Sequence, residues 1–350
     1  MSKEKRGFQG GEKLVMDPQW NKRNRKFAYV QTTISEEKND YVSNIFIGDL
    51  IHGIMPFTDG ENQTVSPRWS PDGDKLVFVS DRTKLPQIYV KDVNRGEAKQ
   101  LTHCESGVRN PVWSPCGEML VFSTIGTNPK VAEELVLLNV KTNELTPIVR
   151  ECRNYHSVVW SPDGSFIAFS ACAFSQPTTV VDVFILELET KEIRKLTNSN
   201  GFFTSTTWSP DGEKLGFVGY EKDNKGVPIS RVWIYHFRYT ELACLTSEFD
   251  ISVGNEIEGD FHWATVNPGL LWTEDSEGFY FLVTDQGSNG IYYGSLDGAM
   301  YPIVLEQEHI YGMTMITDIH EAIACISKQT ERVELYHLDF KTQERTKLQT

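Results

Sequence analysis

The pentapeptide WSPDG occurs three times in this 350-residue chain, at 69–73, 160–164 and 208–212. WSPCG at 113–117 and WTEDS at 272–276 are variants of the same motif. Proline presets φ for the first central position of a tight turn, aspartate suits the next, and glycine tolerates positive φ. The motif therefore predicts a series of tight turns, each placed directly after a tryptophan that ends a strand.

Each turn is followed by the same order of apolar segments. In the first clear copy these are KLVFVS at 75–80, QIYVKDV at 87–93 and KQLT at 99–102. Short apolar runs bounded by turn residues are typical of strands buried on both faces. Fainter copies precede and follow the five clear ones, so the anchor positions are 20, 69, 113, 160, 208, 272 and 315.

A repeat of 40 to 50 residues with four strand-like pieces is typical of a propeller blade. The sequence thus predicts an all-β fold, a seven-bladed β-propeller of four-stranded antiparallel blades, after an N-terminal tail at 1–13. Each blade is predicted to use contiguous chain, so that the ring closes without strand exchange between the first and last blades. The predicted blade boundaries are 14–58, 59–102, 103–148, 149–197, 198–246, 247–305 and 306–350.

The longest interval between anchors, at 247–270, predicts an acidic insertion between the fifth and sixth blades. Its Glu256, Glu258 and Asp260 are candidates for a ligand-binding loop, although charge runs of this kind are commonly solvated surface. A second hypothesis concerns His103, His156, His262 and His309, which precede successive anchors and are candidate ligands for a divalent metal. Ordinary packing or surface histidines are the simpler interpretation, and neither a resident metal nor a cofactor is predicted.

Composition excludes several classes of partner. The chain has 34 Lys and Arg against 48 Asp and Glu, a net charge of −14, which disfavours binding to nucleic acid. It contains no apolar run long enough to span a membrane. Its six cysteines are scattered singly, and no apolar segment follows the basic start of the chain. We therefore expect reduced thiols and a cytoplasmic location.

The sequence holds none of the common catalytic signatures. It has no GxSxG serine motif, no GxxxxGK[ST] phosphate loop and no HExxH zinc motif. The recurrent Asp72, Asp163 and Asp211 occupy the turn position of the repeat, which explains them without catalysis. No catalytic residue is predicted in this chain.

The repeat resembles the propellers of the prolyl oligopeptidase family and of TolB-like proteins. Two stretches, DPQW…NDYVSNIFIGDL within 17–50 and FYFLVTDQGSNGIYYGSLDGAMYPIVLE at 279–306, are similar to the acylaminoacyl-peptidase-like branch. In that branch the propeller caps an α/β-hydrolase peptidase domain and limits entry to short peptides. The resemblance implies that this chain is the non-catalytic gate and size filter of such a serine peptidase, with the hydrolase domain as its partner.

Two other functions stay open at this stage. One is a free-standing, TolB-like propeller that binds a protein or peptide. The other is a metal-dependent propeller lyase that uses the histidines named above.

Overall fold

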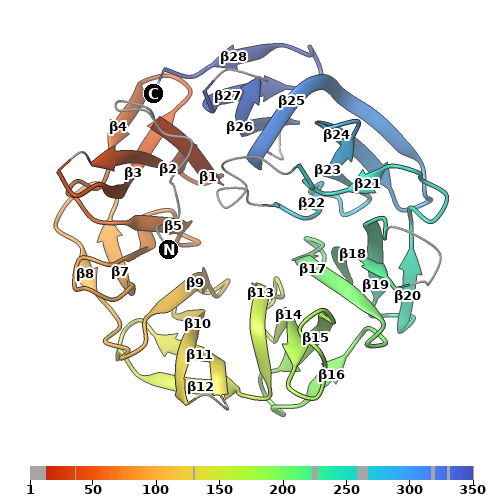
Figure 1. The fold of residues 1–350 in the computed structure, drawn as a ribbon, viewed down its shortest axis with the longest axis horizontal. Coiled ribbons are helices and arrows are strands. Elements are labelled where there is room, and N and C mark those ends of the chain that lie inside the picture. Colours follow the sequence, from red (N-terminus) through yellow and green to blue (C-terminus); the bar gives the residue numbers. More distant parts are fainter. Residues whose placement is uncertain are drawn as a thin grey trace.

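A computed structural model describes residues 13–35, 37–128, 131–222, 228–257, 267–316, 320–328 and 332–349. These residues form strands and turns and contain no helix, which confirms the all-β prediction. Antiparallel sheets are arranged around a central axis, with the first strand of each sheet nearest that axis (Figure 1). Within the same residues, nothing helical is long and apolar enough to cross a membrane.

Five separate sheets have four strands each, in simple up-and-down order, and we number them blades 1 to 5. Blade 1 has β1 (Lys13–Asn21), β2 (Lys26–Ser35), β3 (Asp40–Asp49) and β4 (Gly53–Pro56). Blade 2 has β5 (Thr64–Trp69), β6 (Lys75–Ser80), β7 (Gln87–Asp92) and β8 (Lys99–Gln100). Blade 3 has β9 (Val108–Trp113), β10 (Met119–Asn128), β11 (Val131–Asn139) and β12 (Leu145–Val149). Blade 4 has β13 (Cys152–Trp160), β14 (Phe166–Ala173), β15 (Asp182–Glu187) and β16 (Ile193–Lys195). Blade 5 has β17 (Gly201–Trp208), β18 (Lys214–Glu221), β19 (Arg231–His236) and β20 (Glu241–Cys244).

The remaining strands belong to one eight-stranded sheet, and its long strand β25 (Met300–Ile316) explains why it is undivided. β25 pairs with β24 as far as Glu308 and with β26 from Glu308 onward. We name the part before Glu308 blade 6 and the part after it blade 7. Counted in this way the ring has the seven units that the repeat predicts, whereas counted as one sheet it has six. The other strands are β21 (Ser252–Val253), β22 (Leu271–Trp272), β23 (Gly278–Asp285), β24 (Ser288–Ser295), β26 (Glu321–Lys328), β27 (Glu334–Asp339) and β28 (Arg345–Lys347).

Apolar residues from neighbouring blades form the core between the sheets. The middle strands are buried almost throughout: β6 buries Leu76 and Phe78, and β14 buries Ile167 and Phe169. This accounts for the segments after each motif that are apolar on both faces, because both faces of a blade pack on other blades.

The motif tryptophans tie successive blades together. The indole Nε1 of Trp69 donates to the carbonyl oxygen of Gln19 in blade 1, at 3.0 Å. In the next two blades, Trp113 donates to Arg68 and Trp160 to Val112, at 3.1 and 3.2 Å. In each pair the acceptor is the residue just before the preceding blade's tryptophan. The repeat therefore encodes a hydrogen bond between blades as well as a turn.

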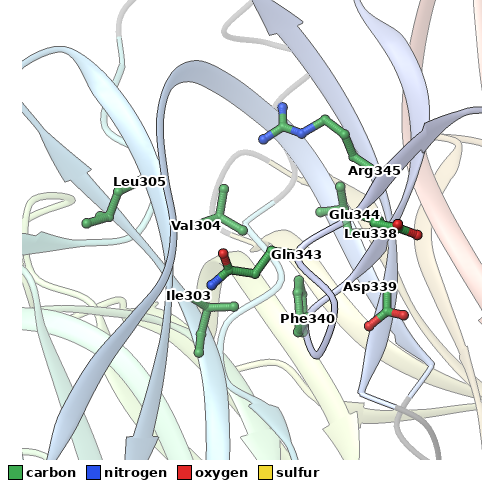
Figure 2. Close-up of a pocket in the computed structure, with 9 residues that line it drawn as sticks. All are labelled: Ile303, Val304, Leu305, Leu338, Asp339, Phe340, Gln343, Glu344 and Arg345. Atoms are coloured by element: carbon green, nitrogen blue, oxygen red, sulfur yellow. The ribbon is translucent and has the colours of Figure 1, made fainter.

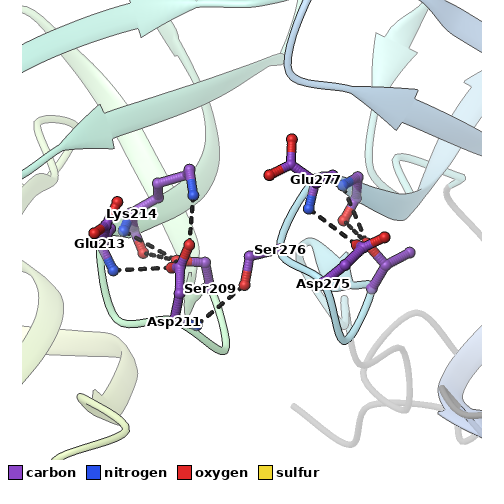
Figure 3. A network of polar contacts seen from close by, with 9 residues as sticks. Ser209, Asp211, Glu213, Lys214, Asp275, Ser276 and Glu277 are labelled. Atoms are coloured by element: carbon purple, nitrogen blue, oxygen red, sulfur yellow. Dashed lines mark hydrogen bonds and ion pairs between the residues drawn. The ribbon is translucent and has the colours of Figure 1, made fainter.

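The motif turns also touch one another around one end of the ring, which we call the motif end. A Cβ placed on Gly117 would lie 3.4 Å from the Cδ of Pro71 in the preceding blade's turn. Between blades 5 and 6, the backbone nitrogen of Asp211 donates to the Ser276 hydroxyl at 3.0 Å (Figure 3). The end where the first strands begin is the opposite end, and both β1 starts and β28 finishes there because the strands alternate in direction.

Blades 1 and 7 meet without a shared sheet among the described strands. β1 packs against β25, and the backbone nitrogen of Trp20 donates to the Thr314 hydroxyl at 3.2 Å. The Trp20 indole nitrogen is buried without a hydrogen-bond partner in the described chain, and Met315 occupies the anchor position of the neighbouring blade. Within the described residues the two blades therefore meet by packing, in agreement with the prediction.

Candidate functional site

The first strands line the axis of the ring, and five of the seven blades show the same backbone distortion there. Residues with positive φ occur three positions before the anchor tryptophan: Asp17, Ser66, Asn110 and Ser205, with φ between 51° and 56°, and Gly269 at 71°. The pairing register of β1, β5, β9 and β17 shifts at these points, as expected for β-bulges. The tetrapeptides DPQW, SPRW and NPVW carry a sequence signal for this distortion, which lies just before the WSPDG motif.

One ion pair spans two of these bulges. The Asp17 carboxylate accepts from Arg68 Nη1 at 2.8 Å and from Gln19 Nε2 at 2.8 Å. Asp17 is only 6% exposed, so its charge is balanced by the neighbouring blade rather than by water. This arrangement joins blades 1 and 2 at the axis and has a structural role.

The turn aspartates also have structural roles. Asp72 accepts a hydrogen bond from the Ser70 hydroxyl, and Asp163 accepts one from Ser161. These bonds lower the pKa of both carboxyls, and the serine hydroxyls are the largest cause. Figure 3 shows the corresponding Ser209–Asp211 pair of blade 5, where Lys214 Nζ adds an ion pair at 2.6 Å.

The candidate metal ligands have separate surroundings where the structure describes them. His103 Nδ1 lies 3.2 Å from Gln100 Nε2, the His156 ring packs edge-on against Phe202, and His309 stacks on Tyr311 with ring centroids 4.0 Å apart. Burial lowers the pKa of His309. In the described chain no group of three His, Cys, Asp or Glu side chains is placed to hold a metal ion. His262 lies outside the described residues.

The acidic insertion lies inside blade 6, which refines its predicted position. β21 pairs with β23 at Ser252 and Val253, and β22 pairs with the same strand at Leu271 and Trp272. The insertion therefore interrupts the first strand of blade 6, the strand nearest the axis. Of the three candidate ligand residues, Glu256 is described and exposed, whereas Glu258 and Asp260 lie outside the described residues.

A pocket of about 300 Å³ lies where this strand is interrupted, between blades 5 and 6. It is near the opposite end of the ring, because its blade 5 residues come from the start of β17 and the end of β18. Phe202, Tyr220, Asn255, Glu256 and Asn267 contribute side chains to its lining. This inner pocket is our candidate functional site.

Two other pockets lie on the outer rim, each between the fourth strand of one blade and the turn between the third and fourth strands of the next. The pocket in Figure 2, of about 190 Å³, lies between Ile303–Leu305 of blade 6 and the turn between β27 and β28. A second, of about 220 Å³, lies between Met55–Phe57 of blade 1 and the β7–β8 turn of blade 2. Because flat blades diverge outward from the axis, such gaps follow from the ring geometry, and we assign them no function.

The fold and the repeat define a β-propeller whose strands nearest the axis carry bulges. Residues 4–168 match the family described as PD40, TolB beta propeller domain. The chain is 35% identical to an uncharacterized peptidase, YuxL, of Bacillus subtilis; the match covers 95% of this chain and 56% of YuxL.

Solved structures agree on the fold. The propeller domain of the Trilobed protease of Pyrococcus furiosus, described as having an open velcro topology, has a TM-score of 0.70 at 19% identity, covering 98% of this chain and 97% of that one. Acylaminoacyl peptidase of Pyrococcus horikoshii has a TM-score of 0.67 at 20% identity, covering 97% of this chain and 52% of the peptidase. A manganese-bound oligogalacturonate lyase has a TM-score of 0.69 at 17% identity, covering 93% and 90% of the two chains. The chain thus spans about half the length of the peptidases that it matches.

Proposed function

We propose that this chain is the non-catalytic propeller of an acylaminoacyl-peptidase-like serine peptidase, and that it restricts which substrates reach the peptidase domain. The alignment with YuxL carries the proposal: it takes in 95% of this chain but only 56% of that peptidase. The resemblance seen in the sequence points to the same division of labour.

The geometry supports one arrangement of the two parts. β28 finishes at the opposite end of the ring, so a peptidase domain following residue 350 would be joined there. The inner pocket is at the same end. A peptide arriving through the ring would pass this pocket before reaching the peptidase domain.

The experiment compares three proteins. We expect the 350-residue chain to give no turnover of acyl-peptide or aminoacyl-nitroanilide substrates. The full-length protein encoded by the open reading frame should cleave short peptides but not a long unfolded protein such as casein. Removal of the propeller from the full protein should extend cleavage to casein, and unchanged size selectivity after that removal would refute the gating role.

We do not propose a lyase activity for this chain. The likeness to the lyase is under 20% identity and concerns the fold, and the described histidines do not converge. A free-standing binding propeller remains the competing function; a full open reading frame that contains no hydrolase segment would favour it.

A further inference from the structure

The inner pocket is rigidly framed on its blade 6 side. Asn255 donates from Nδ2 to the Ile310 carbonyl at 2.6 Å and accepts from the Ile257 nitrogen at 3.1 Å. The Glu256 nitrogen donates to the Thr284 hydroxyl at 2.9 Å. The backbone beside the insertion is therefore attached to β23 and β25, while the Glu256 side chain is left exposed at the pocket.

Blade 5 supplies an aromatic wall. The rings of Phe202 and Tyr220 stack with centroids 6.2 Å apart and planes inclined by 19°. Gly219 of β18 lets the backbones of β17 and β18 approach closely beside these rings, since a Cβ there would lie 2.2 Å from the Phe202 carbonyl oxygen. Both rings are partly exposed at the pocket.

The charge of the lining has one sign. Among the described lining residues, Glu256 is the only carboxylate, and there is no Lys, Arg or His. The Glu256 carboxylate makes no hydrogen bond or ion pair within the described chain. Arg231 of blade 5 follows the lining residue Ser230, but its guanidinium is directed elsewhere, because its Nη1 donates to the Thr246 carbonyl at 2.8 Å. His156 contacts the Phe202 ring from blade 4.

We propose that the inner pocket binds a cationic group of a peptide, with Glu256 as its ion-pair partner and the Phe202–Tyr220 wall covering its apolar stem. A carboxylate binds an ammonium or guanidinium group through charge-assisted hydrogen bonds, and aromatic faces attract cations. Lysine and arginine side chains combine such a group with an apolar stem. This inference rests on the proposed function, because a peptide in transit through the ring is the ligand.

The test measures peptide binding to the 350-residue chain by isothermal titration calorimetry at low salt. The probes are three tripeptide amides: acetyl-Ala-Lys-Ala, its uncharged norleucine analogue, and the norleucine peptide with a free amino end. The first and third separate a side-chain cation from an α-amino group. We expect the lysine peptide to bind about tenfold more tightly than the acetylated norleucine peptide, a ratio typical of one charge-assisted contact.

Two variants make the result specific. Glu256→Gln should remove the preference for charge and leave binding of the acetylated norleucine peptide unchanged. Glu277→Gln, at an exposed glutamate of the motif end, also removes one negative charge. It should change neither the preference for the charged peptide nor the affinity for the acetylated norleucine peptide. Tyr220→Leu should weaken binding of the lysine peptide about threefold by removing half of the wall. Thermal unfolding of each variant confirms that it is folded.

Equal affinity for the charged and uncharged peptides, absence of binding by all three, or a preference that survives Glu256→Gln would overturn the proposal. Tighter binding of the free-amino peptide than of the lysine peptide would overturn the side-chain assignment and transfer the site to peptide amino ends. None of these binding results bears on size selectivity, which is measured by peptide hydrolysis with the full-length protein. A failure of the gating role is therefore distinguishable from a failure of this site.

Discussion

The hydrogen bond between blades makes a quantitative prediction for Trp69→Phe. The substitution removes the indole N–H that donates to Gln19 at 3.0 Å and keeps an aromatic ring in the strand. Losing such a bond and leaving its acceptor unsatisfied costs about 1–2 kcal/mol. Unfolding entropy of about 2.1 cal/mol/K per residue gives roughly 0.7 kcal/mol/K for a chain of this length, so the bond is worth about 1.5–3 °C in Tm.

Trp208 provides the matched control for this measurement. It occupies the same position of the repeat and is also partly buried, but its indole nitrogen is buried without a partner in the described chain. Trp208→Phe removes the same atoms of the indole ring and no hydrogen bond within the described chain. Scanning calorimetry should show a larger fall in Tm for Trp69→Phe than for Trp208→Phe by about 1.5–3 °C. Equal falls would mean that the tryptophans act only through packing.

Three further predictions concern charge, thiols and pH. Glu308, where blades 6 and 7 join, is almost fully buried beside Arg345. Arg345→Met should therefore lower the free energy of unfolding, measured in urea, by about 3 kcal/mol. The double variant Glu308→Leu, Arg345→Met should recover most of that stability, and additive losses from the two substitutions would contradict this. A thiol reagent should label Cys116 quickly in the native protein, because it is the exposed cysteine, and Cys116→Ser should abolish the fast phase. The Ser161 hydroxyl lowers the pKa of Asp163 in the folded protein. The stability gained from this carboxylate is therefore present above its unfolded pKa of about 3.9 and is lost as pH falls through the lower folded value. Asp163→Asn should reduce the fall in Tm between pH 5 and pH 2.5, and an unchanged fall would contradict this.

The sequence alone determined the class of fold because the repeat is local chemistry written several times. Each WSPDG turn depends on residues within a few positions of one another: Ser70 bonds to Asp72, and Gly73 takes a positive φ of 77°. The apolar runs that follow predict the buried middle strands. Closure by packing was predictable too, and within the described residues β1 pairs only inside its own blade.

Only the tertiary structure decided how the blades are joined and where the candidate site lies. Nothing local indicates that Trp69 donates to Gln19, because the two residues meet only when successive blades pack. The same holds for β25, whose continuity across Glu308 depends on pairing with strands on both sides.

The site itself shows the limit most clearly. The sequence identified Glu256 from an acidic interval, yet the position of that residue follows from strand pairing on both sides of the insertion. Its aromatic wall, Phe202 and Tyr220, comes from another blade and carries no motif. Short-range propensities specify turns and strands, whereas a pocket between blades arises from contacts between residues distant in the chain, which only the folded ring brings together.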